Sequence, residues 1–279
     1  MSRWLIALDI DETQIEERSN PHSFEGEEET IQELRDSLNK IKMHQSIIIA
    51  HISNGMHSLF DAVEHKLANA DYLTANASTC IYHKSNSGWS LEENYQELIH
   101  ASGYQTIIAE HIADEFLLLE QTGAEHQTHF KRSFTFKDLS LSKEERLNIF
   151  DALQNKVVHY SGMKAFYVEG KLNDKGFVDS AGPYAVIDIL PSMCTKNECI
   201  NYIIKKENIN SHNVIVAGNG DNDISMFQPE YFTIAVANAQ SSLKRHSLHL
   251  ADINAKRHII SKGIRSAGVL EGLRYFNIL

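Results

Sequence analysis

Two carboxylates one residue apart lie at the end of the first apolar stretch of the sequence. Asp9 and Asp11 end the run Trp4–Ile10, which is typical of a buried parallel strand. Two acids this close repel each other, and a divalent cation removes that cost. Magnesium binds one or two carboxylates together with waters and a substrate phosphate. The pair therefore predicts metal-assisted chemistry on an anionic substrate, although by itself it fits two ordinary loop acids equally well.

Polar residues also follow two later stretches that are typical of buried strands. Ser53 and Asn54 come directly after residues 46–52, and the segment Gly-Asn-Gly-Asp-Asn-Asp at 218–223 comes after residues 213–217. Ligands of a parallel α/β sheet bind beyond the carboxyl ends of its strands. We therefore expect both segments to lie at the same edge of the sheet as the first pair of acids.

A lysine opens a predicted helix just before the third of these strands. Thr195 and Glu198 have the spacing of a capping box, and isoleucines at helical spacing follow at positions 200, 203 and 204. Lys196 then occupies the first helical position, where its ammonium group and the helix N-terminus both favour an anion. Carboxylates, a hydroxyl group and a lysine at one edge suit a metal-assisted reaction of an anionic substrate.

Hydrophobic spacing also predicts elements away from that edge. Residues 29–41 and 58–70 have the spacing of amphipathic helices, whereas residues 157–160 are expected to form a short strand. Residues 130–136 alternate between apolar and polar side chains, which favours an antiparallel strand with one solvated face. Such strands interrupt the pattern of buried parallel strands, which indicates an inserted domain.

The segment Leu-Asp-Ile-Asp-Glu-Thr at 8–13 resembles the DxDxT signature of haloacid dehalogenase-type phosphatases. The order of the four segments, with Ser53 second, Lys196 third and residues 218–223 last, is also similar to that superfamily. Within it the chain looks most like sucrose-phosphate phosphatases and related sugar-phosphate phosphatases. Three further segments carry this second resemblance, at 188–191, 237–240 and 267–276.

The resemblance implies an α/β fold, with a Rossmann-like parallel-sheet core domain and an inserted α+β cap domain. We expect residues 1–83 and 193–279 to form the core domain. Residues 84–192 would form the cap, placed over the edge of the sheet that carries Asp9. The cap of this class of enzymes shuts out water and contacts the leaving group.

The resemblance also implies a two-step displacement at phosphorus. Asp9 would attack and form an aspartyl-phosphate that water then hydrolyses, and Asp11 would protonate the leaving oxygen and later activate the water. The implied cofactor is Mg2+, and its implied ligands are Asp9, Asp11, Asn219 and Asp223. The residues implied in binding the substrate phosphate are Ser53, Asn54, Lys196 and Asn222.

The sequence departs from the family pattern at two places. The fourth motif of the family usually begins Gly-Asp, but here the second position is Asn219, which brings an amide oxygen and no charge. Asp221 or Asp223 could supply the missing charge. In the second motif either Ser53 or Asn54 could hold the phosphate, and we expect Ser53, because other branches of the superfamily use Ser-Asn.

The composition limits the partners of the protein. The 279 residues carry a formal net charge of -11, which argues against nucleic acid or an anionic membrane surface as the main partner. No apolar run approaches the roughly 20 residues of a membrane span. Three cysteines without a disulfide framework favour reduced thiols and a cytoplasmic location.

We therefore predict a magnesium-dependent phosphatase of a small phosphorylated sugar, either sucrose-phosphate-like or glycosyl-phosphoglycerate-like. One alternative is a non-catalytic sugar-phosphate-binding module, to which Asn219 gives weight. The other is a phosphosugar mutase, which would return the phosphoryl group to the sugar instead of to water. The presence of Asp9, Asp11 and Lys196 favours an enzyme.

Overall fold

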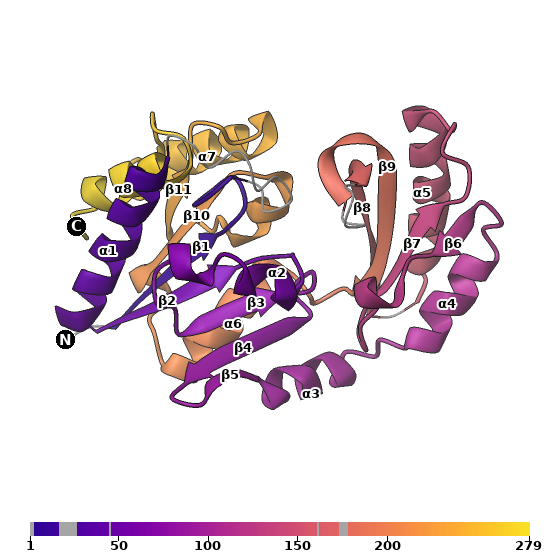
Figure 1. The fold of residues 1–279 in the computed structure, drawn as a ribbon, viewed down its shortest axis with the longest axis horizontal. Coiled ribbons are helices and arrows are strands. Elements are labelled where there is room, and N and C mark those ends of the chain that lie inside the picture. The colour runs from indigo at the N-terminus through magenta and orange to yellow at the C-terminus, as the bar shows by residue number, and fades with distance from the viewer. Residues whose placement is uncertain (1–2, 17–26, 45, 161, 173–177) are drawn as a thin grey trace. The chain divides into compact units, whose positions relative to one another are not determined.

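The chain folds into two units, shown in Figure 1. This computed structural model describes residues 3–16, 27–44, 46–160, 162–172 and 178–279. Unit 1 comprises Met1–Glu92 and Thr195–Leu279, and unit 2 comprises Glu93–Cys194. Unit 2 is therefore one continuous insertion into unit 1, and each unit is described by itself below.

Unit 1 is built on an eight-stranded sheet with the order β12-β11-β10-β1-β2-β3-β4-β5. Its strands are β1 (Trp4–Asp9), β2 (Ile47–Ile52), β3 (Tyr72–Ala75), β4 (Cys80–Ser85), β5 (Gly88–Leu91), β10 (Val214–Gly218), β11 (Phe232–Ala235) and β12 (His258–Ile260). The six strands from β12 to β3 pair in parallel, and β4 and β5 continue the sheet in antiparallel fashion. The expected α/β fold with a Rossmann-like parallel sheet is confirmed.

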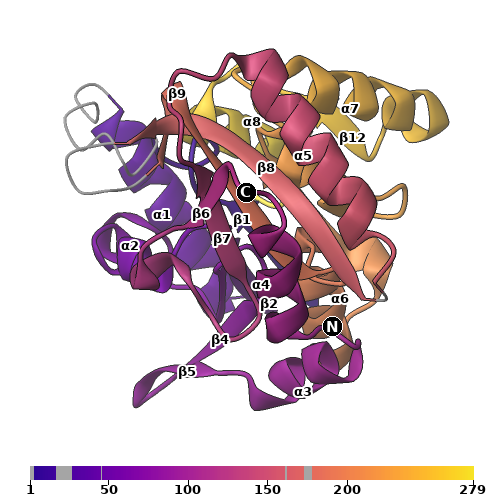
Figure 2. The ribbon, with the colours of Figure 1, turned by 90° about the vertical axis from the view of Figure 1, so that its right-hand side faces the viewer.

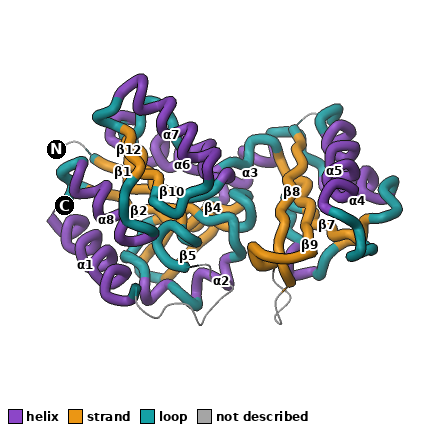
Figure 3. Tube along the Cα trace, turned by 90° about the horizontal axis from the view of Figure 1, so that it is seen from above, coloured by secondary structure: helices purple, strands orange, loops and turns teal. Residues whose placement is uncertain are grey.

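Helices cover both faces of this sheet. They are α1 (Glu28–His44), α2 (His57–Asp61), α6 (Lys196–Glu207), α7 (Ser241–Asn254) and α8 (Arg265–Tyr275), with the 3-10 helices η1 (Glu64–Lys66), η3 (Ser211–Asn213) and η4 (Asp221–Met226). Figure 3 shows α1 and α8 on one face and α6 and α7 on the other. Strands β1, β2 and β10 are buried along nearly their whole length, because a parallel sheet between two helical layers has no solvated face.

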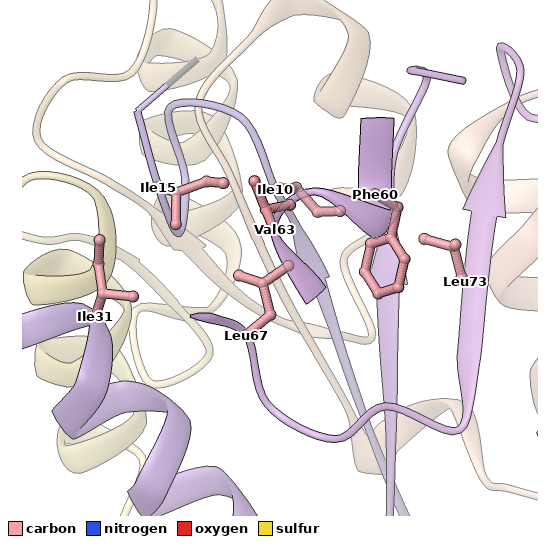
Figure 4. Packing of buried hydrophobic residues seen from close by; sticks show 7 residues of the cluster. All are labelled: Ile10, Ile15, Ile31, Phe60, Val63, Leu67 and Leu73. Carbon is pink, nitrogen blue, oxygen red and sulfur yellow. The ribbon is translucent and has the colours of Figure 1, made fainter. Parts of the chain in front are cut away.

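Residues 58–70 do not form the single continuous helix that was predicted. Their apolar side chains are buried as expected, but the segment forms the short helix α2 and the 3-10 turn η1. The backbone leaves the helical path at Val63, a β-branched residue with φ of -120°. The members of this part of the core, drawn in Figure 4, are Ile10, Ile15, Ile31, Phe60, Val63, Leu67 and Leu73.

Unit 2 has its own antiparallel sheet with the order β6-β7-β9-β8. Its elements are α3 (Glu93–Ala101), α4 (Thr106–Asp114), β6 (Leu119–Gln121), η2 (Ala124–His126), β7 (Arg132–Phe136), α5 (Lys143–Val157), β8 (Met163–Leu172) and β9 (Val178–Pro191). Figure 2 shows α4 and α5 against the same face of this sheet. The strand predicted over 157–160 is wrong: a capping box between Ser142 and Glu145 starts α5, which continues to Val157.

The insertion starts later in the structure than the sequence pattern indicates. We expected it over 84–192, whereas unit 2 covers Glu93–Cys194. The difference arises because β4 pairs with β3 and β5 pairs with β4, so both strands belong to the sheet of unit 1. Strand β5 forms the edge of that sheet, and both β5 and the second half of β4 carry half-buried or exposed side chains, unlike the buried strands at the centre of the sheet.

No helix in the described parts of the chain is both long enough and apolar enough to span a bilayer.

Candidate active site

The polar segments that follow β1, β2 and β10 meet at one point of the sheet. Strand β1 lies between β10 and β2, and the chain extends the sheet outward from β1 through β2 and β3 on one side and through β10, β11 and β12 on the other. The register places Asp9 beside Ile52, and Leu8 beside Ala217. The next residues of the two neighbouring strands are Ser53 and Gly218, so the three strand ends lie level. Such a switch in strand order leaves a crevice where ligands of α/β proteins bind.

The centre of the site is a lysine between two buried carboxylates. Lys196 Nζ lies 2.6 Å from Asp9 Oδ1 and 2.5 Å from Asp223 Oδ1. All three side chains are almost inaccessible to solvent, with relative exposures of 2 % for Lys196, 5 % for Asp9 and 0 % for Asp223. When ionised, the three groups sum to one negative charge in a buried place. That surplus favours binding of a further cation.

Helix α6 positions this lysine. Thr195 is the N-cap, and its hydroxyl oxygen accepts a hydrogen bond from Glu198 N at 3.1 Å. Lys196 is the first residue of the helix, as predicted, and its side chain points into the site. The helix begins there because the cap satisfies one of the amide groups that the first turn leaves unpaired.

The surroundings of Asp9 shift the pKa of its carboxyl group. Burial and the negative charge of Asp223 together raise the pKa of Asp9 to about 7, although Lys196 opposes the rise. Burial alone would lower the pKa of Lys196, but Asp223 and Asp9 outweigh that effect and raise it. The lysine is therefore charged at neutral pH, whereas Asp9 needs added positive charge to be fully ionised.

Asp223 shapes the loop that follows β10. Its Oδ2 accepts hydrogen bonds from Asn219 N at 2.7 Å and Gly220 N at 2.8 Å, while its Oδ1 accepts one from Lys196. The fit is tight at Gly218, because a Cβ atom built there would lie 2.7 Å from the Asp223 side chain. The glycine at the strand end is thus what allows the carboxylate to fold back over the loop.

Thr13 joins the segment after β1 to that loop, and its role was missed by sequence reasoning. Its Oγ1 lies 2.9 Å from Asp9 Oδ2 and 3.0 Å from Asn219 Oδ1. The three side chains therefore meet around a single hydroxyl group. Thr13 is the last residue of the DxDxT pattern, so the signal was present in the sequence.

Ser53 and Asn54 form a turn at the end of β2. Ser53 is buried, and its hydroxyl oxygen accepts a hydrogen bond from Gly55 N at 3.0 Å. The Asn54 carboxamide oxygen lies 3.3 Å from Ser78 Oγ, and its main-chain carbonyl accepts from Ala77 N at 2.9 Å. Ser53 is thus turned toward the strand end, and Asn54 holds the neighbouring loop.

The remaining predicted site residues lie around this centre. Asp11 is half-buried and forms an isolated bridge with Ile15 in the loop after β1. Asn222 is exposed. Asp221 is also exposed, and Ser242 at the start of α7 donates a hydrogen bond to its carboxylate. In this arrangement Asp221 contacts α7 and not Asn219.

A buried histidine supports the main chain of Asp9 from inside the sheet, and no sequence signal pointed to it. Gln14 Nε2 donates to the main-chain oxygen of Asp9 at 2.9 Å and lies 3.2 Å from His51 Nδ1. His51 Nε2 lies 3.0 Å from the carbonyl oxygen of Ala68. A carbonyl can only accept, so Nε2 carries the proton and Nδ1 accepts from Gln14. Burial lowers the pKa of His51 to about 4, which keeps this ring neutral.

The donor set of the site fits a hard divalent cation. Among the described residues there is no cluster of three or more His, Cys, Asp or Glu that could hold a metal ion. Magnesium does not need one, because it binds one or two carboxylates plus waters and a substrate phosphate. Asp9 and Asn219 present oxygen atoms around Thr13, in a place with surplus negative charge.

Comparison with known proteins gives a match over nearly the whole chain. The family model of sucrose-6F-phosphate phosphohydrolase matches residues 2–277. A putative haloacid dehalogenase-like hydrolase from Nitrosococcus oceani is 23% identical over 287 residues, which cover 98% of this chain and 71% of that protein. A phosphoglycolate phosphatase from Archaeoglobus fulgidus is 28% identical over 102 residues, or 37% of this chain and 40% of that protein.

Solved structures with the same fold cover the chain from end to end. A sucrose-phosphatase from Synechocystis, solved in complex with sucrose and phosphate, has a TM-score of 0.71 and 19% identity and covers 99% of both chains. A haloacid dehalogenase-like hydrolase from Bacillus subtilis has a TM-score of 0.70 and 17% identity, covering 100% of this chain and 93% of that one. At these identities the likeness shows the fold.

Proposed function

Since the chain belongs to the sucrose-6F-phosphate phosphohydrolase family, we propose that it hydrolyses a small phosphorylated sugar, with Mg2+, through an aspartyl-phosphate on Asp9. The membership confirms the resemblance to haloacid dehalogenase-type phosphatases, and the chain is a phosphoric monoester hydrolase. The observation that best supports the finer proposal is the buried group of Lys196 between Asp9 and Asp223 at the switch point of the sheet.

The first step would be attack of an Asp9 carboxylate oxygen on the phosphorus atom. Lys196 would contact a phosphoryl oxygen in place of one of its present contacts with a carboxylate, and the Ser53 hydroxyl would donate to another phosphoryl oxygen. Asp11, which is half-buried in the loop after β1, would give its proton to the leaving sugar oxygen. Fixed donors and charges that face the transferred group supply most of the catalysis in phosphoryl transfer.

The second step would be hydrolysis of the aspartyl-phosphate. Asp11, now ionised, would take a proton from the attacking water. Asp9 would leave as a carboxylate, and inorganic phosphate would be released. The Gln14–His51 pair would hold the Asp9 main chain in place through both steps.

A magnesium ion would be held by Asp9, the main-chain carbonyl of Asp11 and the Asn219 side chain. When bound, it neutralises charge on the transferred phosphoryl group. We propose that Asp223 supports this site through Lys196 and the loop amides, because both its oxygens already accept hydrogen bonds. Asn54 and Asn222 would lie at the margin of the phosphate site.

The substrate class follows from the family and from one relative. The Synechocystis sucrose-phosphatase was solved with sucrose and phosphate. We propose a substrate of the same kind, a sucrose-phosphate-like or glycosyl-phosphoglycerate-like ester, whose sugar would be read by unit 2 acting as a cap domain. That role for the inserted unit remains a prediction.

The test is phosphate release from a panel of sugar phosphates, with Mg2+ and with a chelator. We expect metal-dependent release from at least one disaccharide or glycosyl-acid phosphate. Asp9→Asn should lower turnover by several orders of magnitude, with a melting temperature close to that of the wild type because Lys196 still pairs with Asp223. Asp36→Asn, an exposed acid of α1, is the matched control and should keep full activity.

Three results would contradict the proposal. Tight sugar-phosphate binding without phosphate release would indicate a non-catalytic binding module. An isomerised sugar phosphate as the product would indicate a mutase. Turnover of the Asp9→Asn variant near the wild-type rate would exclude Asp9 as the nucleophile.

A further inference from the structure

Two residues with left-handed backbone conformation face each other beside the proposed site. Glu12 has φ of 58° and Arg265 has φ of 45°. Residues other than glycine, asparagine and aspartate seldom adopt this backbone conformation, because their Cβ atom approaches the following carbonyl oxygen. Glu12 lies between Asp11 and Thr13, and Arg265 is the first residue of α8. Strain of this kind persists only where the surrounding contacts enforce it.

The contact between them is a forked ion pair. Arg265 Nη2 lies 3.1 Å from both carboxylate oxygens of Glu12, and its Nε lies 3.2 Å from one of them. The same guanidinium group reaches Glu27 at 2.8 Å and Glu16 at 3.6 Å. The arginine side chain is only 16% exposed. A planar fork of this type fixes the orientation of a carboxylate as well as its distance.

The main chain of the same loop is held from the same side. Asn238 Nδ2 donates to the carbonyl oxygen of Glu12 at 2.7 Å, and its Oδ1 accepts from Arg265 N at 3.0 Å. Ser266 Oγ donates to the carbonyl oxygen of Gln14. The side chain and the carbonyl of Glu12 are thus both fixed by residues more than 220 positions away in the sequence. We call Asn238, Arg265 and Ser266 the loop clamp.

We propose that the loop clamp positions Asp11 for proton transfer by holding Glu12, its neighbour in the chain. This inference rests on the proposed function, in which Asp11 is the acid that protonates the leaving oxygen. Asp11 and Glu12 share one peptide unit in a short loop whose far end is tied back to β1, because Thr13 and Gln14 both hydrogen-bond to Asp9. A change in the φ of Glu12 must therefore be taken up in part by the backbone of Asp11, which moves the Asp11 carboxylate. Misplacement of a catalytic group by about 1 Å can cost on the order of a hundredfold in rate. Arg265 and Asn238 are therefore positioning residues, and neither needs to touch the substrate.

A purely structural role for the clamp makes a different prediction. If it only ties α8 to the rest of unit 1, its loss lowers stability or affects all substrates alike. If the clamp positions the acid, the fall in kcat/KM after its removal depends on the leaving group. An alkoxide leaving group needs the proton from Asp11, whereas 4-nitrophenolate leaves readily without it. The ratio of kcat/KM for the two substrate types therefore reports on the acid alone.

The experiment compares Arg265→Gln with Arg274→Gln in the full-length protein with Mg2+. Arg274 lies on the same helix and pairs with Glu33, but both side chains are about half exposed. Each variant is assayed with the best sugar phosphate of the panel and with 4-nitrophenyl phosphate. We expect Arg265→Gln to lose about tenfold or more in kcat/KM for the sugar phosphate, since general acid catalysis contributes on the order of 10² or more. For 4-nitrophenyl phosphate it should stay within about threefold of the wild type, and Arg274→Gln should change neither value.

A second variant guards against misfolding. Glu12→Gln keeps the size of the side chain and breaks the charged fork, so it should reproduce the selective loss for the sugar phosphate. Equal losses for both substrates, or no loss for either, in a variant that melts like the wild type would overturn the clamp. The clamp would also be overturned if the wild-type protein hydrolyses 4-nitrophenyl phosphate and neither variant changes the ratio of kcat/KM for the two substrates. A wild-type protein that hydrolyses neither ester would overturn the proposed function, and this inference with it.

Discussion

At the scale of single residues, the site divides its work between two carboxylates that share one ammonium group. Asp9 is at the strand end and presents its second oxygen to Thr13. Asp223 uses its second oxygen to hold two amides of its own loop. In the proposed mechanism, only Asp9 meets the substrate. Removal of Lys196 would leave two buried carboxylates without their shared partner, a change that typically costs 3–5 kcal/mol, so its role is structural as well as chemical.

Asn219 gives a residue-scale prediction about the metal. Replacing its amide by a carboxylate adds one negative charge beside Asp9 and Thr13. A nearby charge pair contributes on the order of 1 to 4 kcal/mol, depending on the effective dielectric, so Asn219→Asp should lower the Mg2+ concentration for half-maximal activity by about fivefold or more. The Mg2+-dependent rise in melting temperature should move to lower concentrations in parallel. An unchanged or raised midpoint would mean that another group already completes the metal site.

Sequence reasoning found the residues whose place follows from strand ends. Asp9, Ser53 and residues 218–223 come directly after buried strands, and Lys196 follows a helix cap, so pattern alone brings them together. It could not find His51 or Arg265. His51 lies inside a strand and makes its contacts through Gln14, and Arg265 meets Glu12 across 253 positions of sequence. Contacts of this kind depend on tertiary packing, which no local pattern encodes.

At the scale of elements, the junction between β10 and η4 depends on the absence of a Cβ atom. Gly218→Ala places a methyl group 2.7 Å from the buried Asp223 side chain. It should destabilise the protein by about 1 to 3 kcal/mol, as overpacking of a core does, and it should lower activity by displacing Lys196. Urea unfolding measures the first effect and phosphate release the second.

Gly220→Ala is the matched control for this variant. Its new Cβ would come within 2.6 Å of the end of the exposed Asn222 side chain, which can move away, and would meet Asp223 at an ordinary contact distance of 3.8 Å. The two substitutions remove the same conformational freedom from the unfolded chain, so the difference between them isolates the clash. Equal stability of the two variants would show that Asp223 is not held tightly against the strand end.

Strand β2 carries a buried histidine, His51, that contributes to the pH dependence of stability. The pKa of His51 is lowered by burial from 6.5 to about 4. Between these values the unfolded chain takes up a proton that the folded protein does not, so stability is fully present above pH 6.5 and is lost as the pH falls toward 4. The full loss is about 3 kcal/mol. His51→Gln should remove this component, so its unfolding free energy should fall less than that of the wild type between pH 7 and pH 5. Parallel curves for the two proteins would contradict the neutral, buried ring.

Elements were predicted well where burial was complete and poorly where it was partial. The strands β1, β2 and β10 were anticipated because helices cover both of their faces, which leaves an unbroken apolar run. The insertion was expected to begin at residue 84, which places β5 and the last two residues of β4 in it, because strands with exposed side chains near the edge of a sheet look the same in either unit. The break near Val63 was missed because its apolar side chains are buried at the same spacing as in a regular helix.

At the scale of the whole molecule, unit 2 is one uninterrupted segment with its own sheet and helices. We expect a fragment of residues 93–194 to fold by itself and to show a cooperative thermal transition. A fragment of residues 84–192, the boundary that the sequence pattern suggests, should be less stable and more prone to aggregate. It carries Trp89, whose ring packs on Phe60 in unit 1 at 5.6 Å, and exposes it to solvent. Circular dichroism melts of both fragments check this, and a disordered 93–194 fragment would show that the unit depends on the rest of the chain.

Helix α6 anchors both places where the chain passes between its two units. Glu92, the last residue before the insertion, is held by Tyr202 at 2.8 Å and Lys206 at 2.5 Å, and the chain returns at Thr195, the N-cap of the same helix. Each anchor is made entirely within unit 1. During evolution an inserted domain can therefore be lengthened, rebuilt or exchanged without dislodging Lys196 from its carboxylates. A lineage built on this helix can inherit its phosphoryl chemistry unchanged while it acquires new substrates.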